Sequence, residues 1–490
     1  MSAQYYDESR QGLLSRAIMT GLLVAIVFTA LAHGAVEPWS VALFEIIVLA
    51  LVLMWAVKII ADRRMEIRIP QVAMPLVGLV CIGLAQSIAI TGGDGNWRSL
   101  SINVESSRRA VTVLIFLVIA FVIAANFFAS RRRLSAIATF LTLFGLALAV
   151  FALVQHFTWN GRFYWLRPNS ISTSPFGPFV NHNHFAGYME MLIPIPLALM
   201  ITRAVRGEMR LLYGFAATMM GVAAVASLSR GGMISIAASL VFIFVMSLRL
   251  ARIEKRGGTS AQRRALPAAV ASSRPALLPR AVVVILIAGV IAAGVFWIGP
   301  DSVINRVTQG EVQGRTSQRE TFYASRGWLW SDTLAMIKAN PALGVGLGAY
   351  ETAFSLYTRS DGALRVPQAH NDYLQVVADC GILGGALAVW FIVILFRNVR
   401  RGIKSRDTLV AGLALGSGTS IFAMLVHSLF DFNLQLPSNA LLFLFLSAIA
   451  SQVCAIALDT ERSSTLPARR GHSETESENV SVASLVKGAS

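Results

Sequence analysis

Residues 370–384 carry more groups capable of chemistry than any other part of the chain. The segment reads HNDYLQVVADCGILG, so a histidine, two amides, two carboxylates and a tyrosine occur within ten residues. An apolar run long enough to cross a membrane follows at once. An imidazole can act as a general base near neutral pH, and neighbouring polar groups can orient it. Such groups at the edge of a membrane span suit a substrate that is attached to a lipid.

A second polar segment, NHNH, enters another predicted span. Asn181, His182, Asn183 and His184 stand where a helix begins, and an asparagine there commonly caps the first turn. No cysteine or acidic pair near them completes a metal site. We therefore expect capping together with hydrogen bonds to a polar ligand.

Three arginines lie near these segments. Arg230 is in the tight turn SLSRGG between two spans, and Arg319 and Arg326 precede an aromatic stretch. A guanidinium group can bind two phosphate oxygens at once, and the adjacent Gly231 and Gly232 permit a close approach. The alternatives are a snorkelling turn residue for Arg230 and ordinary surface charges for the other two. His427 and Asp431 bracket a further short turn, and we expect at most a supporting role for them.

The composition indicates which elements position these groups. Apolar residues make up 55% of the 490 and charged residues 14%, whereas soluble domains contain more charge. Apolar runs of about 20 residues predict transmembrane helices. We expect an all-α, polytopic membrane protein with about twelve spans. They are predicted at residues 17–33, 40–57, 70–90, 110–129, 134–156, 184–202, 211–227, 232–248, 281–299, 377–396, 408–427 and 438–458.

The distribution of positive charge predicts the orientation. Alternate connections and the two termini hold 29 of the 42 Lys and Arg residues, and basic loops resist translocation. With twelve spans they all fall on one side, so we expect both termini in the cytoplasm. The net charge of +16 is then an orientation signal, partly available to anionic membrane lipids, and does not indicate a nucleic-acid partner.

The chain divides into four predicted parts. Residues 1–299 hold the first nine spans, with a flexible cytoplasmic linker at 249–280. Residues 300–376 form an outer domain of short helices, because apolar and aromatic residues recur there at helical spacing before a Gly-rich turn. Residues 377–458 hold the last three spans, and 459–490 are a disordered cytoplasmic tail.

Four segments, in this order, resemble the O-antigen ligase and polysaccharide polymerase superfamily of bacterial inner-membrane proteins. They read PFVNHNHFAGYMEM, SLSRGGM, RGWLW…NPALGVGLGAY and HNDYLQVVADCGILG. The last fits the pattern of the ligases, in which His-Asn is followed by nine residues and Gly-x-x-Gly. The resemblance covers roughly residues 150–430. It implies a helical, GT-C-like membrane fold with one large periplasmic loop domain.

The resemblance also implies an activity, namely transfer of a glycan from an undecaprenyl-diphosphate carrier to an acceptor hydroxyl at the periplasmic face. The acceptor would be lipid A-core or a growing polysaccharide. His370 would be the general base or a ligand of the diphosphate, and Arg230 and Arg326 would bind the diphosphate. Asp372 would orient His370 or simply begin a helix. The residues expected to bind substrate are Asn181, His182, Asn183, His184, Arg319, Asn371, Asp372 and Tyr373.

Several functions stay open at this point. The Gly-x-x-Gly spacing favours a ligase, and a polymerase is the main alternative. A protein O-oligosaccharyltransferase, a transporter of lipid-linked sugars and a structural scaffold are the others. We expect a metal-independent enzyme without a cofactor, because the outer segments contain no Asp-x-Asp or paired acidic ligand set.

Overall fold

The chain folds into a helical bundle with very little β-structure. The computed structural model describes residues 2–63, 67–91, 97–169, 175–205, 207–257, 289, 326–358 and 365–465. Within them, ten helices are long and apolar enough to cross a membrane. The strands form two short antiparallel ribbons, in which β1 (Ala89–Thr91) pairs with β2 (Trp97–Ser99) and β3 (Arg162–Phe163) with β4 (Arg167–Pro168). The predicted all-α, polytopic fold class is confirmed.

The ten candidate spans of the described residues follow one another along the chain, with one shorter helix after the second span, two before α17 and a 3-10 turn before α19. The spans are α1 (Ser2–Leu31), α2 (Pro38–Asp62), α4 (Val104–Phe127), α5 (Arg131–Phe157), α6 (His182–Leu192) with α7 (Pro194–Ile201), α8 (Met209–Ala226), α9 (Arg230–Gly257), α17 (Asp372–Gly402), α18 (Thr408–His427) and α19 (Pro437–Thr465). The shorter elements are α3 (Ala73–Gln86), α15 (Arg326–Ala339), α16 (Tyr350–Tyr357) and η1 (Asn433–Gln435).

Ten of the twelve predicted spans match these helices. The span predicted at 70–90 corresponds to α3, which has 14 residues and, at about 1.5 Å per residue, is too short for a hydrocarbon core of about 30 Å. The span predicted at 281–299 lies outside the described residues except for residue 289. The predicted linker at 249–280 and the predicted tail at 459–490 also lie largely outside them.

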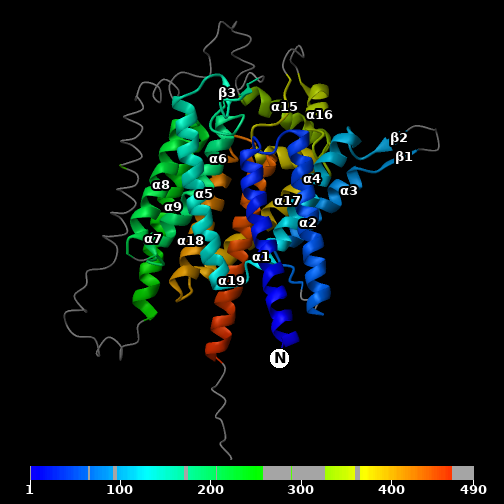
Figure 1. Cartoon of the computed structure of the whole chain (residues 1–490). Coiled ribbons are helices and arrows are strands. Elements are labelled where there is room, and N and C mark those ends of the chain that lie inside the picture. Colours follow the sequence, from blue (N-terminus) through cyan, green and yellow to red (C-terminus); the bar gives the residue numbers. More distant parts are fainter. Residues whose placement is uncertain are drawn as a thin grey trace, which may run out of the picture.

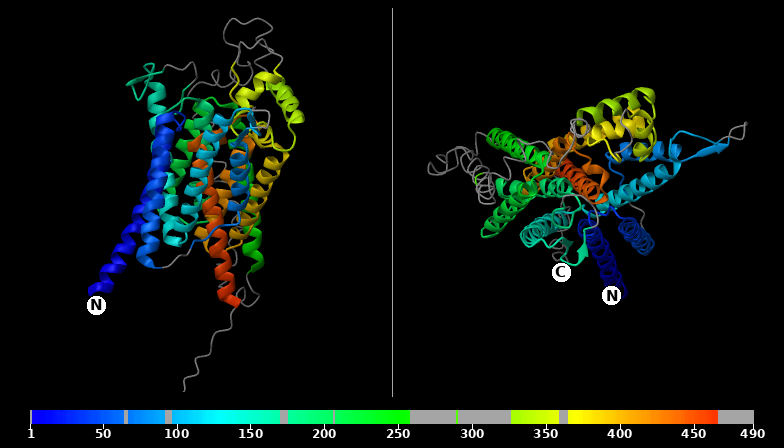
Figure 2. Two further views of the ribbon diagram at one scale, coloured as in Figure 1. Left: turned by 90° about the vertical axis from the view of Figure 1, so that its right-hand side faces the viewer. Right: turned by 90° about the horizontal axis from the view of Figure 1, so that it is seen from above.

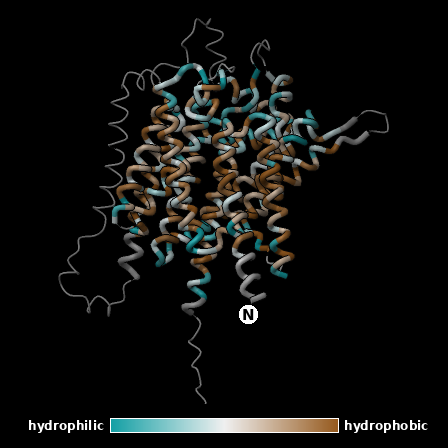
Figure 3. Tube along the Cα trace, viewed as in Figure 1, coloured by the Kyte–Doolittle hydropathy of each residue, from teal (hydrophilic) through white to brown (hydrophobic). Residues whose placement is uncertain are grey.

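The two ends of the bundle differ in what they carry (Figure 1). The start of α1 and the end of α19 lie at one end, and α15, α16 and strand β3 lie at the other, which we call the α15 end. A hydrophobic band separates the more polar ends (Figure 3). The described parts of both chain ends are therefore on the side opposite to α15 and α16, as the predicted orientation requires.

Among the described spans, the most enclosed are α6 with α7, α18 and α19, whereas α9 and α17, which begin at the candidate site, are more exposed. Seen along the bundle, α18 and α19 lie near its centre (Figure 2). Helix α18 packs against α7, α9 and α19, and glycines permit a close approach. A Cβ added to Gly416 would lie 3.2 Å from the backbone of Ile195. Close packing of this kind holds the ends of α6, α9 and α18 in fixed positions.

Helices α15 and α16 form a second, smaller apolar core. Trp328 packs edge-on against Phe354 with ring centroids 5.8 Å apart, and Thr333 Oγ1 lies 2.6 Å from the hydroxyl of the buried Tyr350. Between the helices the chain turns through Gly344, Gly346 and Gly348, all with positive φ. The described part of residues 300–376 thus has two short helices joined by a Gly-rich turn, and the outer domain as a whole stays a prediction.

Helix α17 is broken at Gly381, where φ is 66° and ψ is −168°. The turn after α15 binds the freed backbone groups, because Val345 N donates to Ala378 O at 2.9 Å and Ile382 N donates to Pro341 O at 2.8 Å. A Cβ on Gly381 would lie 2.1 Å from Ala342 O. The first glycine of Gly-x-x-Gly thus lets α15, α16 and α17 meet at one point, which places the start of α17.

A substitution at this break should destabilise the protein strongly. Gly381→Ala would combine a positive φ with a collision against backbone, so we expect a loss of roughly 1–3 kcal/mol or more and a clear fall of the apparent Tm in detergent. Gly327→Ala in α15 is the control, because nothing lies within 4 Å of the added Cβ. Equal melting temperatures for the two variants would contradict the role given to Gly381.

Candidate functional site

His370 lies at the α15 end, directly before α17. Its side chain is 35% exposed, and its Nδ1 lies 3.2 Å from Oδ1 of Asp431, whose side chain is 1% exposed. Phe432 packs edge-on against the imidazole, with centroids 4.8 Å apart. A carboxylate only accepts hydrogen bonds, so Nδ1 carries the proton and Nε2 of the neutral ring is left with a lone pair. This is the arrangement that a general base requires.

The backbone of His370 is held in an unfavourable conformation by its neighbours. Its φ is 47°, in the left-handed region that few non-glycine residues adopt. Ala369 on one side accepts a hydrogen bond from Trp330 Nε1 at 3.1 Å and donates one to Gln375 Oε1 at 2.8 Å. On the other side, Asp372 N donates to Ser428 O at 2.9 Å. Strain of this kind persists only where the surroundings impose it, and it is frequent at functional sites.

Asp431 is the carboxylate that orients His370, and it stays ionised. Burial alone would raise its pKa, but the hydrogen bond from His370 and the nearby imidazoles of His184 and His427 outweigh burial and hold the pKa far below its ordinary value. The sequence predicted at most a supporting role for Asp431, and the structure shows that its carboxylate contacts His370 Nδ1. Its position in a turn 61 residues from His370 in the chain gave no signal of their contact.

Removing this charge should impair the reaction and lower the stability of the fold at pH 4 and above. Asp431→Asn leaves the imidazole without its ionic partner, so we expect activity to fall about 10²-fold or more. Because folding lowers the pKa of Asp431, the carboxylate stabilises the native state above its ordinary pKa of 3.8, and this stabilisation is lost as the pH falls through the folded-state value. At both pH 7 and pH 4, Asp431→Asn should therefore have a lower melting temperature than the wild type.

Asn371 and Asp372 hold the start of α17 against the turn after α18. Asn371 caps α17 through Tyr373 N and Leu374 N and donates to Leu429 O at 3.1 Å. Asp372 Oδ2 accepts from Ser428 Oγ at 2.8 Å. The prediction that Asp372 orients His370 is therefore wrong, since Asp431 does so, and the helix-start interpretation holds.

Tyr373 is the most exposed of the three residues after His370. Its hydroxyl donates to Leu425 O at 2.7 Å, and 37% of the residue is exposed. That Asn371, Asp372 or Tyr373 contacts the substrate stays a prediction. Of the three side chains, Tyr373 is the most accessible to a substrate.

The NHNH segment begins α6 as predicted. Asn181 caps the helix by accepting from Asn183 N at 2.8 Å. His184 is buried, and its Nδ1 lies 3.1 Å from Oδ1 of Asn433, in the turn that carries Asp431. His184 therefore supports the site from below, whereas His182 and Asn183 are half-buried at the start of the helix. Their contact with substrate stays a prediction.

Arg230 begins α9 beside the turn that carries Asp431. The next residue, Gly231, lies against His427 and Phe430, since a Cβ added there would be 2.8 Å from His427 Nε2 and 3.4 Å from Phe430 Cβ. The half-buried Arg230 and the residues around Asp431 thus share one end of the bundle. The other two predicted arginines cannot be placed in the same way, because Arg319 and the side chain of Arg326 lie outside the described residues.

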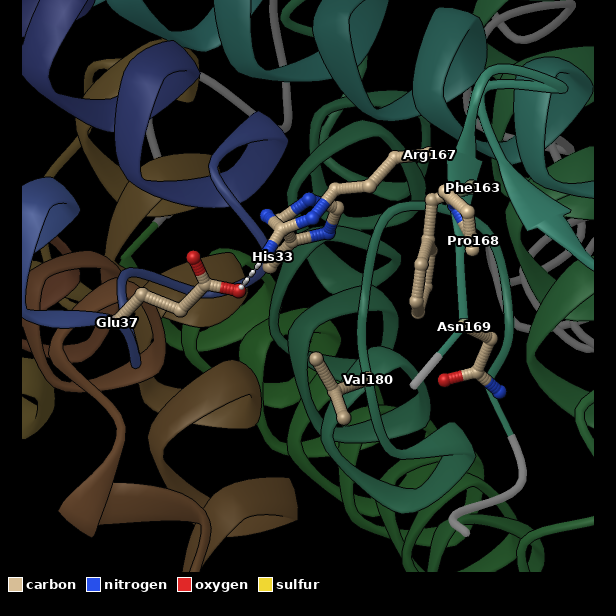
Figure 4. A pocket seen from close by; sticks show the side chains of 7 residues that line it. All are labelled: His33, Glu37, Phe163, Arg167, Pro168, Asn169 and Val180. Atoms are coloured by element: carbon tan, nitrogen blue, oxygen red, sulfur yellow. Dashed lines mark hydrogen bonds and ion pairs between the residues drawn. The ribbon is translucent and has the colours of Figure 1, made fainter. Parts of the chain in front are cut away.

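A small polar pocket lies elsewhere at the α15 end, around the ribbon of β3 and β4 (Figure 4). Arg167 Nη2 is 2.7 Å from Oε1 of Glu37, and His33 Nδ1 lies 2.9 Å from Pro178 O. Burial lowers the pKa of the His33 imidazole. Phe163 packs edge-on against that ring. The ion pair between Arg167 and Glu37 joins the ribbon to the α1–α2 connection.

The geometry holds an oriented imidazole against a buried carboxylate at the edge of a hydrophobic band (Figure 3), and the backbone of Arg230 begins α9 beside the same turn. Such a set can remove a proton from a hydroxyl group and bind an anionic group next to a lipid phase.

Comparison with known proteins finds a family match for part of the chain. A family model described as O-Antigen ligase matches residues 215–391, a region that includes Arg230, α15, α16 and His370. No curated protein matches the chain. The part of the chain that the structure describes holds ten candidate spans and a polar site at one end of the bundle, and residues 215–391 of this multi-pass membrane protein are similar to the O-antigen ligase family.

Proposed function

We propose that the protein transfers a glycan from an undecaprenyl-diphosphate carrier to an acceptor hydroxyl at the periplasmic face of the bacterial inner membrane. The observation that carries the proposal is His370, a half-exposed imidazole bound to the buried Asp431 at the α15 end. The family match and the orientation predicted from positive charge support the same reading. Among the activities of this family, we propose an O-antigen ligase-like role in surface polysaccharide synthesis.

The proposed reaction forms one bond and breaks one. The acceptor oxygen attacks the anomeric carbon of the carrier-linked sugar, and the bond from that carbon to the diphosphate oxygen breaks. The hydroxyl proton passes to Nε2 of His370, and Asp431 stabilises the imidazolium that forms. The glycan is then bonded to the acceptor oxygen, and the carrier leaves as undecaprenyl diphosphate.

The leaving diphosphate gains negative charge as its bond to the sugar breaks. Cations placed in advance to meet such charge usually make the largest contribution to catalysis. Arg230 stands beside the Asp431 turn at the bundle end, and we propose that it binds the diphosphate. Arg326 begins α15 and is proposed for the same role on the resemblance alone.

A reconstituted assay tests the activity. Purified protein in liposomes receives undecaprenyl-diphosphate-linked glycan together with either lipid A-core or unmodified carrier-linked repeat units. Glycan on lipid A-core supports a ligase, and longer carrier-linked chains support a polymerase. Movement of the donor across the bilayer without any new glycosidic bond would instead support a transporter and overturn the proposal.

The reaction should not depend on a divalent cation. The outer segments offer no paired acidic ligand set, and we propose that arginines neutralise the diphosphate instead. Initial rates in the reconstituted assay should stay within twofold after incubation with excess EDTA. A loss of activity that added Mg²⁺ or Mn²⁺ restores would contradict the metal-independent mechanism.

A further inference from the structure

Beneath the candidate site lies a buried acid–imidazole pair that the proposed reaction does not use. Glu190 of α6 and His427 of α18 are fully buried, with Oε2 of the glutamate 2.9 Å from Nδ1 of the histidine. Ser235 of α9 donates a hydrogen bond to the same carboxylate oxygen. The pair therefore joins three helices whose ends form the site.

Stability alone does not explain this pair. Among the described residues, Glu190 Oε1 and His427 Nε2 are buried without a hydrogen-bond partner, which is costly. Apolar residues of similar size in place of a buried ion pair are often at least as stable. Ionisable groups within a membrane span are correspondingly rare and usually functional. Glu190 is the only charged residue of the span His182–Ile201, which was a signal in the sequence.

The ring of His427 sets the position of the first turn of α9. Its Nε2 and Cδ2 both lie 2.8 Å from where a Cβ of Gly231 would be, so the ring edge rests directly on the backbone next to Arg230. The turn before it reverses sharply, with a φ of 59° at Leu228, and Ser229 Oγ caps the helix by accepting from Gly232 N at 3.2 Å. A shift of the ring would therefore shift Arg230.

The backbone of the same residue holds the turn that carries Asp431. His427 O accepts hydrogen bonds from Phe430 N at 2.8 Å and from Asp431 N at 3.1 Å. His427 thus contacts the arginine turn through its ring and the carboxylate turn through its carbonyl group. Glu190 fixes the orientation of the ring between them.

We propose that Glu190 and His427 are positioning residues that set the distance between the Arg230 guanidinium and the His370–Asp431 pair. The inference rests on the proposed function, since it assigns to Arg230 a lipid-linked diphosphate. Misplacement of a reacting group by about 1 Å can cost about 10² in rate, so the effect of losing the pair is measurable.

A double-mutant cycle with Arg230 tests the proposal. Glu190→Gln keeps the size of the side chain and removes its charge. We expect it to lower kcat about 10²-fold in the wild-type background with KM for the acceptor unchanged, and by less than about threefold when Arg230 is already alanine. Equal losses in both backgrounds, or full activity of Glu190→Gln, would overturn the proposal.

Two serines on α9 give a matched pair of variants. Ser235→Ala removes a hydrogen bond to Glu190, whereas Ser239→Ala removes one to Ile236 O within the same helix. Both serines are buried and lie one turn apart. We expect Ser235→Ala to lower kcat and Ser239→Ala to leave it unchanged, with similar melting temperatures. The same loss in both would indicate a general packing effect and contradict the proposal.

A binding measurement separates this inference from the proposed function. Wild-type protein and variants in nanodiscs are titrated with undecaprenyl diphosphate. Glu190→Gln and Arg230→Ala should each raise the Kd, and the double variant should have about the same Kd as Arg230→Ala alone. Binding with this coupling but no glycan transfer would refute the proposed function and retain the inference. Absence of diphosphate binding to the wild type would refute both.

Discussion

Replacement of His370 by asparagine is expected to reduce glycan transfer by about 10²- to 10⁴-fold, the contribution typical of a general base. Asparagine is chosen because it tolerates the left-handed backbone that His370 adopts, at φ 47°, better than alanine does. The variant should therefore fold as the wild type does while lacking a group that accepts the proton. Initial rates with the lipid-linked donor measure the effect.

His370→Ala serves as the comparison for His370→Asn. If backbone strain were the only role of the residue, His370→Asn would remain active and only His370→Ala would fail. If both variants lose transfer while His370→Asn keeps the wild-type melting temperature, the imidazole itself is required. Full activity of both variants would favour a scaffold without enzymatic activity.

Replacement of Arg230 by alanine should have an effect of similar size. Loss of one preorganised group that stabilises developing charge typically costs about 10²- to 10³-fold in kcat. Lysine should restore only part of the rate, because an ammonium group cannot bind two phosphate oxygens side by side. Single-turnover rates at saturating donor measure the loss in the chemical step.

Two arginines at the opposite end of the bundle, Arg203 and Arg210, offer control positions for Arg230. Arg203 lies in the connection between α7 and α8 and Arg210 in the first turn of α8, at the end of the bundle opposite to the start of α9 (Figure 1). Arg210→Ala should leave transfer unchanged. Arg230→Ala with the same rate as Arg210→Ala would contradict the proposed diphosphate clamp.

The membrane architecture could be predicted from the sequence because apolar length is a local property. Ten of the predicted spans depend on runs of about 20 apolar residues, and each run became a helix. The length of helix α3 was overestimated, because apolar residues continue in the sequence after Ser87, where the helix ends. The caps at Asn181 and Asn371 were likewise local signals.

The contacts within the site could not be predicted in the same way, because they join distant residues. Asp372 is two positions from His370 in sequence, yet its carboxylate bonds to Ser428, and Asp431 reaches the imidazole from another helix end. Proximity in sequence favoured the wrong carboxylate. The pair of Glu190 and His427 is separated by 237 positions and was missed for the same reason.

The Gly-x-x-Gly spacing illustrates how one pattern serves two purposes. It suggested a ligase by resemblance, and in the structure Gly381 breaks α17 so that the turn after α15 can pair with it. The backbone conformation at this position therefore requires a glycine, whichever acceptor the protein uses. Only an assay with defined acceptors distinguishes a ligase from a polymerase.

The proposed function requires that the α15 end faces the periplasm. In a variant without native cysteines, Leu356→Cys on the exposed side of α16 and Lys404→Cys at the opposite end can be labelled with a membrane-impermeant maleimide in intact spheroplasts. We predict labelling of residue 356 from outside and of residue 404 only after permeabilisation. The reverse pattern would place His370 and Arg230 in the cytosol, away from the periplasmic acceptor, and contradict the proposal.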